Sequence, residues 1–185
     1  MTQPIRGRAT QDEILEAFAA RLRSAVNGLN TATVVVSDQP VPSIMPAGGF
    51  LVTVAPGAGE FPHQLWANGH HATATEDGSV IVSFYMQSVK DAPGRKDSAI
   101  LSSKPNRPSL MKWKRSILKA LTVSDEPYVV SRHVWEPIKD GRFLLRDQPQ
   151  PVRVTGILDV PEHKSWISFQ MTFSCTWDWE LYEDA

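Results

Sequence analysis

Residues 167–181 have the sequence ISFQMTFSCTWDWEL, in which apolar and polar side chains alternate without a break. A period of two places successive side chains on opposite faces of a β-strand. At roughly 3.3 Å per residue this strand would extend about 50 Å, whereas common strands have about 5–6 residues. The stretch therefore predicts one long strand whose apolar face packs on a core. That face comprises Ile167, Phe169, Met171, Phe173, Cys175, Trp177, Trp179 and Leu181.

The predicted length of this strand has a consequence for its backbone. A strand that outruns its sheet leaves N–H and C=O groups unpaired, and a neighbouring chain can satisfy them by strand addition. We therefore expect residues 177–181 either to bend over the chain's own core or to contact an adjacent subunit. Trp177 and Trp179 are interface candidates because aromatic side chains dominate interface energetics.

Two amphipathic helices are predicted, over residues 10–29 and 108–121. Thr10 and Glu13 fit a capping box at the start of the first helix. Apolar residues recur at helical spacing in both segments, so each helix should pack one face on a core. We expect the following side chains to be buried: Ile14, Phe18, Leu22, Trp113 and Ile117.

Further strands are predicted from short apolar or β-branched runs. Asp77-Gly78 lies between two such runs, and this dipeptide favours a type I′ hairpin turn. The predicted strands cover residues 33–36, 50–54, 71–75, 79–86, 127–135, 142–146 and 152–160. Together with the helices they predict an α+β fold, with both amphipathic helices packed on an antiparallel or mixed β-sheet.

The chain has 185 residues, of which 42% are hydrophobic and 21% charged, which is the composition of a globular domain. This length fits one α+β domain over residues 1–185. Residues 1–9 contain little apolar surface and are predicted to form an N-terminal arm. Residues 87–107 combine Pro, Gly and charged residues and are predicted to form a long charged loop, which in compact domains is usually functional.

Composition also excludes several classes of protein. Cys175 is the single cysteine, so no intrachain disulfide can form and a reducing compartment is expected. The N-terminus lacks the apolar segment of a signal peptide. The longest uncharged stretch, residues 39–59, is rich in Pro and Gly, so no membrane span is predicted. The formal net charge of −1 gives no general attraction to nucleic acid.

Motifs for catalysis are missing from the sequence. It contains no phosphate-binding P-loop, dinucleotide fingerprint or nucleophile elbow, and we predict no catalytic residues, cofactor or metal. His63, His70 and His71 lie close together in the sequence and leave a metal-dependent enzyme open as an alternative. Adjacent residues of a strand point to opposite faces, however, which separates His70 from His71. Cys175 lies on an apolar strand face and is expected to be structural.

Charge is distributed unevenly along the chain. Residues 104–119 carry only positive charges, whereas residues 165–185 carry only negative ones. The basic segment is either a solvated helix face or a patch for phosphates or an acidic protein surface. A chain with a basic patch and an acidic end can associate head to tail with its own copies. The basic interface candidates are Lys104, Arg107, Lys112, Arg115 and Lys119.

The order of these elements, an amphipathic helix, strands, a second amphipathic helix and long strands, resembles that of the tail terminator (tail completion, neck) proteins of tailed bacteriophages. The resemblance covers residues 10–181 and depends on pattern, so it carries over no site residue. Residues 87–107 and 127–150 would be additions to the simplest form of that family.

The resemblance implies a structural virion protein, made in the host cytoplasm and located in the tail or neck. Its subunits would form a ring, commonly a hexamer, that caps the tail tube and joins it to the neck. The implied partners are its own copies, tail-tube and neck proteins, and passing DNA. A second alternative, beside the enzyme above, is a small adaptor that binds an acidic partner through the basic helix.

Overall fold

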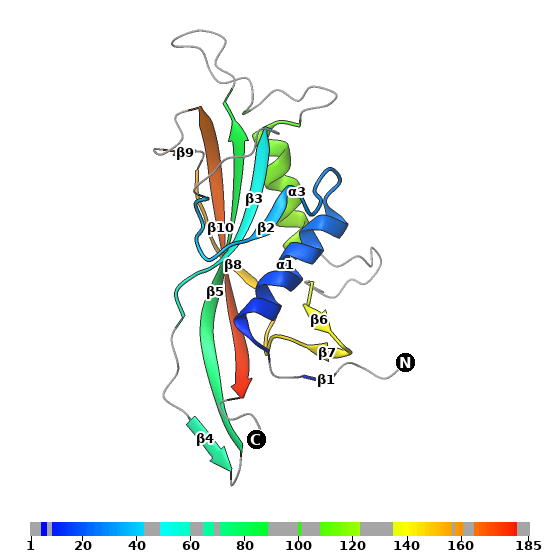
Figure 1. Ribbon diagram of the computed structural model, residues 1–185, viewed down its shortest axis with the longest axis vertical. Helices are drawn as coiled ribbons and strands as arrows, with labels where there is room; N and C mark the ends of the chain where they lie inside the picture. The colour runs from blue at the N-terminus through cyan, green and yellow to red at the C-terminus, as the bar shows by residue number, and fades with distance from the viewer. Residues whose placement is uncertain are drawn as a thin grey trace.

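The computed structural model shows an α+β fold (Figure 1). It describes residues 5–6, 9–42, 49–59, 65–68, 71–88, 100, 108–122, 135–156, 158–160 and 165–180. Its helices are α1 (Gln11–Ala25) and α3 (Leu110–Thr122). Its strands are β1 (Ile5–Arg6), β2 (Val34–Val36), β3 (Phe50–Pro56), β4 (Leu65–Asn68), β5 (His71–Gln87), β6 (Ile138–Lys139), β7 (Arg142–Phe143), β8 (Gln150–Val154), β9 (Leu158–Asp159) and β10 (Trp166–Glu180).

The main sheet is mixed, which confirms the predicted fold class. Its path runs β2-β3-β5-β10-β8, with β4 beside β5 and β9 beside β10. β2 and β3 are parallel, whereas the other neighbours in this sheet are antiparallel. A separate small sheet, β1-β7-β6, brings part of the predicted N-terminal arm beside β7.

The expectation that the last strand would outrun its sheet is wrong. β10 pairs with β5 along its whole length, from Trp166 opposite Gln87 to Glu180 opposite Thr73. The second edge of β10 pairs with β9 and β8, and beyond them two backbone N–H groups of the same chain continue the cover. Arg146 donates to the carbonyl of Thr176 at 2.7 Å, and Ala9 donates to the carbonyl of Asp178 at 3.0 Å. The chain itself therefore supplies backbone hydrogen-bond partners along both edges of β10.

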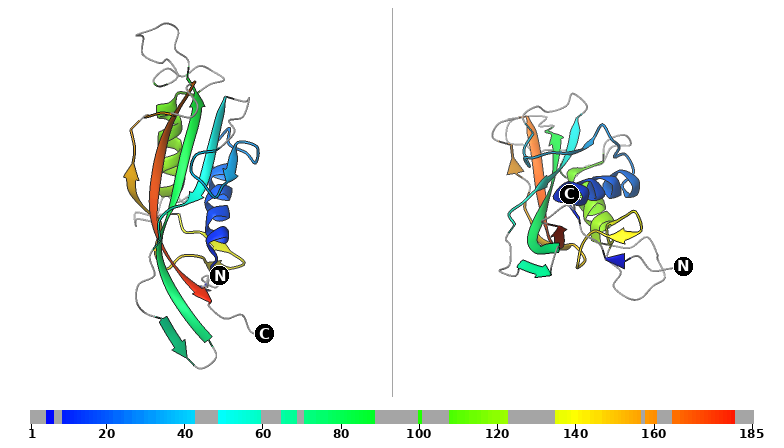
Figure 2. Two further views of the ribbon diagram at one scale, coloured as in Figure 1. Left: turned by 60° about the vertical axis from the view of Figure 1, so that its left-hand side comes forward. Right: turned by 60° about the horizontal axis from the view of Figure 1, so that its bottom comes forward.

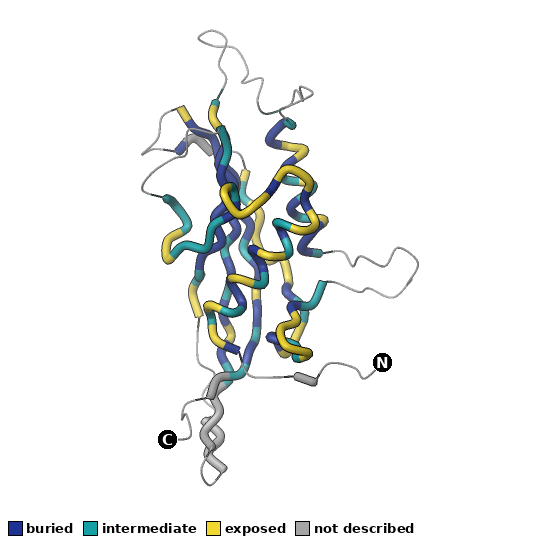
Figure 3. The backbone as a smooth tube through the Cα atoms, turned by 45° about the vertical axis from the view of Figure 1, so that its right-hand side comes forward, coloured by how far each residue is buried: buried dark blue, intermediate teal, exposed yellow. Residues whose placement is uncertain are grey.

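Both helices pack on the same face of the main sheet (Figure 1 and the right panel of Figure 2). The five side chains predicted to be buried are all in this core. Phe18 of α1 contacts Phe173 of β10 edge-on, with ring centroids 5.7 Å apart. The predicted capping box is also present, since Glu13 N donates to Thr10 Oγ1 and Thr10 N donates to a Glu13 carboxylate oxygen. The outer sides of both helices remain exposed (Figure 3).

The other face of the sheet has a smaller apolar cluster of Leu51, Tyr85, Val160 and Trp166. The hydroxyls of Thr53 and Tyr85 both donate to the carbonyl of Pro40, which fixes the segment after β2 over this face.

Among the described residues, no helix has the length and apolarity needed to cross a membrane.

The predicted hairpin turn at Asp77-Gly78 is also wrong, because β5 continues through it. Gly78 lies opposite Cys175 in the ladder, and the indole of Trp177 covers it. A Cβ atom on Gly78 would lie 2.3 Å from Trp177 Cη2, so the close approach of the ring requires glycine. The reversal occurs earlier instead, where Asn68 of β4 lies opposite His71 of β5.

Four further predictions differ in extent or lie at least partly outside the described residues. The strand predicted over 142–146 is reduced to β7, and that over 152–160 is divided into β8 and β9. Residues 127–134 and most of the predicted 87–107 loop lie outside the described residues.

Candidate functional site

Helix α3 has two chemically different faces because its apolar and basic residues recur with helical spacing. Leu110, Trp113, Ile117 and Leu121 are buried against the sheet. The Trp113 ring packs against the rings of Phe50 and Phe84, with centroids 5.1 and 5.3 Å apart. This packing fixes the rotation of the helix about its axis, and it turns the opposite side toward solvent.

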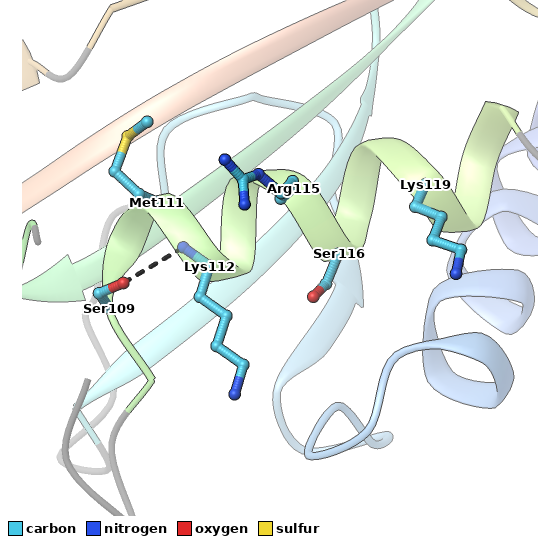
Figure 4. A pocket seen from close by; sticks show the side chains of 6 residues that line it. All are labelled: Ser109, Met111, Lys112, Arg115, Ser116 and Lys119. Atoms are coloured by element: carbon cyan, nitrogen blue, oxygen red, sulfur yellow. Dashed lines mark hydrogen bonds between the residues drawn. The ribbon is translucent and has the colours of Figure 1, made fainter. Parts of the chain in front are cut away.

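The exposed side of α3 borders a surface depression of about 560 Å³ (Figure 4). The described residues that line it are Ser109, Met111, Lys112, Arg115, Ser116 and Lys119. Ser109 precedes the helix, and its hydroxyl accepts a hydrogen bond from the backbone N–H of Lys112 at 3.3 Å. We call this set the α3 basic face.

The three cations of the α3 basic face have no acidic partner among the described residues. Lys112, Arg115 and Lys119 are exposed, and α3 itself contains no carboxylate. Lys114, on the same helix, differs, since its Nζ donates to the carbonyl of Thr155 at 3.0 Å and ties α3 to the segment after β8. Within the described part of the chain, the α3 basic face is therefore a cluster of positive charge without a paired carboxylate.

The groups that line this surface can bind anions. Ammonium, guanidinium and hydroxyl groups all donate hydrogen bonds to carboxylates or phosphates. Met111 is 42% exposed and adds a flexible apolar contact beside the charges. A partner with both acidic and apolar side chains fits this surface.

The structure does not bring all the predicted interface candidates together. Lys112, Arg115 and Lys119 share the α3 basic face, whereas Lys104 and Arg107 lie outside the described residues. The backbone of Trp179 pairs with Ala74, and its side chain is not described.

The prediction of Trp177 as an interface anchor must be corrected. Its side chain is only 1% exposed and belongs to the core that the two helices share. Of the two outcomes expected for this end of the strand, packing on the chain's own core is the one that the structure shows for Trp177. The reason is that Trp177 lies on the face of β10 that packs in the shared core, where its ring covers Gly78 of β5.

The residues considered for chemistry are placed as follows. His63 and His70 lie outside the described residues, as does the side chain of His71. Among the described residues no three potential metal ligands gather. Cys175 is buried, as predicted, and desolvation raises its pKa to about 12, so the thiol remains protonated at neutral pH.

Sequence analysis missed three members of the α3 basic face. Ser109, Met111 and Ser116 lie on its border. The spacing of Ser109, Lys112, Ser116 and Lys119 is that of one helical stripe, so the same periodicity could have identified the two serines. Met111 lies beside the apolar stripe of α3, but its side chain is exposed.

Comparisons with known proteins give no family for this chain: no protein-family description matches its sequence, and no curated protein matches it.

Proposed function

We propose that this protein is a structural virion subunit of the tail terminator kind, which forms a ring, commonly a hexamer, in a bacteriophage tail or neck. In this role it caps the tail tube, joins it to the neck and acts through assembly rather than catalysis. Its neighbours are its own copies, tail-tube and neck proteins, and DNA that passes through the ring.

The observation that carries this proposal is the order and placement of the elements. α1 precedes the first strands of the main sheet, α3 follows β5, and both helices cover one face of a small mixed sheet. The bacteriophage family that the sequence resembles has subunits with this order of helices and strands.

The long ladder supports an assembly role in a second way. β4, the start of β5 and the end of β10 extend past the helices at the bottom of Figure 1. A ribbon of this kind offers a surface to neighbouring subunits without requiring a separate domain.

Electron microscopy provides the direct test. Negative-stain images of the purified chain should show closed rings, alone or at the ends of isolated tail tubes. Because a cap stops tube growth, particles made without the protein should contain tubes of uneven length that are not joined to heads. Tubes of normal length joined to heads in its absence would refute the proposal.

A small adaptor is the second candidate, and the α3 basic face favours it. Such a protein would bind one acidic partner through Lys112, Arg115 and Lys119 without forming rings. The same images separate the two functions, since an adaptor gives single particles both alone and with tail tubes.

A further inference from the structure

The α3 basic face raises the question of what neutralises it. Four other cations are paired within the chain: Arg23, Lys139, Arg142 and Arg146 each lie within 3.5 Å of a carboxylate oxygen. Lys112, Arg115 and Lys119 have no such pair in the part of the chain that the structure describes. Like charges at helical spacing of three and four residues repel each other, so a bound anionic group would stabilise this face.

The chain itself contains a segment of the matching chemistry. Residues 178–184 have the sequence DWELYED, with four carboxylates, three large apolar or aromatic side chains and no base. Asp178 is already engaged, because it pairs with Arg146 at 3.2 Å and accepts a hydrogen bond from Thr75. The other three carboxylates of this segment, on Glu180, Glu183 and Asp184, equal the three cations in number, and the neighbouring apolar side chains match Met111 in chemistry.

The register of the sheet indicates that this segment cannot reach Lys112 and Arg115 of its own chain. Lys114 bonds to Thr155, whose N–H donates to the carbonyl of Gln170, so the middle of α3 lies level with Gln170 of β10. Glu180 is ten residues farther along β10, which corresponds to about 33 Å.

The chain after Glu180 is too short to return over that distance. The four residues to Asp184 span at most about 14 Å when fully extended. Arg115 is next to Lys114, and Lys112 lies one helical turn before Arg115, so neither comes within reach. Figure 1 shows α3 toward the upper end of the sheet and the end of β10 toward its lower end.

We propose that the α3 basic face of one copy binds the acidic segment of residues 180–184 of a second copy, so that neighbouring subunits associate head to tail. The inference rests on the proposed function insofar as it names the contact between ring neighbours. A contact of two different surfaces is heterologous, and heterologous contacts close into rings when the rotation permits.

A charge-exchange experiment on the full chain tests this pairing. The basic variant K112E/R115E/K119E and the acidic variant E180K/E183K/D184K should each lose the association that the natural chain shows in sedimentation velocity. We expect the association constant to fall by at least about tenfold in each, because three exposed pairs become three repulsive ones. Mixing the two variants should restore it, since each then supplies the surface that the other needs.

The matched control is D12K/D38K/D147K, which reverses three exposed carboxylates elsewhere on the chain. It changes the net charge as much as the acidic variant does, and its association should equal that of the natural chain. Raised salt should weaken the association of the natural chain and of the mixture alike.

Several results would overturn the pairing. These are unchanged association in either variant, failure of the mixture to recover, equal loss in the control, or a natural chain that stays monomeric. Electron microscopy keeps this test separate from that of the proposed function. Rings of normal yield from both variants would overturn the pairing alone, whereas capped and joined tails made without any copy of the protein would overturn the function.

Discussion

The two helices bury their apolar faces in the same core but use their charges differently. Both arginines of α1 contact the chain itself: Arg21 donates to the carbonyl of Ala120 at 2.9 Å, and Arg23 donates to the carbonyl of Val34 at 2.9 Å. Glu13 accepts from Lys139 and Arg142 of the small sheet at 2.9 and 3.0 Å. On α3, by contrast, only Lys114 has such a contact among the described residues.

This difference separates charges that hold the fold from charges that are available to a partner. The cations of α1 join it to α3 and to β2, so their loss should reduce stability. The charged groups of Lys112, Arg115 and Lys119 form no ion pair with the described residues, so their loss should leave stability unchanged and affect association. Substitutions of core residues should lower stability on either helix, whereas substitutions of the cations should lower it on α1 alone.

The largest expected effect is common to both helices. Phe18→Ala should lower the free energy of unfolding by about 3–5 kcal/mol, and Ile117→Ala by about 2–5 kcal/mol, because both side chains are fully buried. Urea denaturation monitored by circular dichroism measures both, and Lys119→Ala is an exposed control. A loss below about 1 kcal/mol for either core variant would mean that its helix does not belong to the shared core.

A smaller loss should follow from Gly78→Ala, which tests whether Trp177 belongs to the core that both helices share. The added methyl group would meet the Trp177 ring, and the overpacking should cost about 1–3 kcal/mol. The cost should shrink when the same substitution is made together with Trp177→Ala, because the ring is then gone. Equal costs in the two backgrounds would show that the ring does not lie over Gly78.

The contact between Gly78 and Trp177 also shows why a local sequence pattern can predict the wrong structure. The apolar alternation of β10 and the helical spacing of α1 and α3 are local signals, and the structure bears them out. Asp77-Gly78 carries a local turn signal as well, but a contact with Trp177, which is distant in sequence, decides its conformation. The interface role of Trp177 was wrong for the same reason, since the contact of its ring with Gly78 of β5 could not be predicted from the β10 segment alone.

The sequence likewise predicted the local part of the candidate site but not its long-range contacts. Helical periodicity identifies Lys112, Arg115 and Lys119 as one exposed face, because the opposite residues are apolar. It does not show that Lys114 bonds to Thr155, since the two are separated by 41 positions. The partners of Glu13 are separated from it by 126 and 129 positions, so sequence spacing could not reveal them either.

Glu13→Gln should have an intermediate effect, since glutamine can retain the capping hydrogen bond but loses the charge. Lys139, Thr10 and Arg142 favour the ionised carboxylate more than burial disfavours it, and they lower the pKa of Glu13 below its ordinary value of 4.5. We expect a loss of about 1 kcal/mol at neutral pH. Glu16→Gln is the matched control, because its pair with Arg23 is longer and more exposed and should contribute almost nothing.

The pH dependence of Glu13→Gln gives a second measure. A carboxyl group whose pKa is lowered by folding stabilises the protein above its unfolded-state pKa, and this stabilisation disappears as the pH falls through the folded-state value. The difference in unfolding free energy between the natural chain and Glu13→Gln should therefore be constant above about pH 5 and vanish in stronger acid. A difference that persists at low pH would assign the effect to packing instead of charge.

The smallest expected effect on stability is that of K112E/R115E/K119E, the variant that most strongly changes the α3 basic face. None of the three cations has a partner among the described residues, so no stabilising pair is lost there. Glutamate at position 112 can complete a capping box with Ser109, whereas glutamate at 119, in the last turn, is unfavourable to the helix dipole. These contributions oppose each other, so the free energy of unfolding should change by no more than about 0.5 kcal/mol. Urea denaturation monitored by circular dichroism measures the free energy of unfolding. The concentration should be one at which the natural chain is monomeric. A loss above about 2 kcal/mol would show that the cations of α3, like those of α1, hold the fold, and the contrast between the two helices would be wrong.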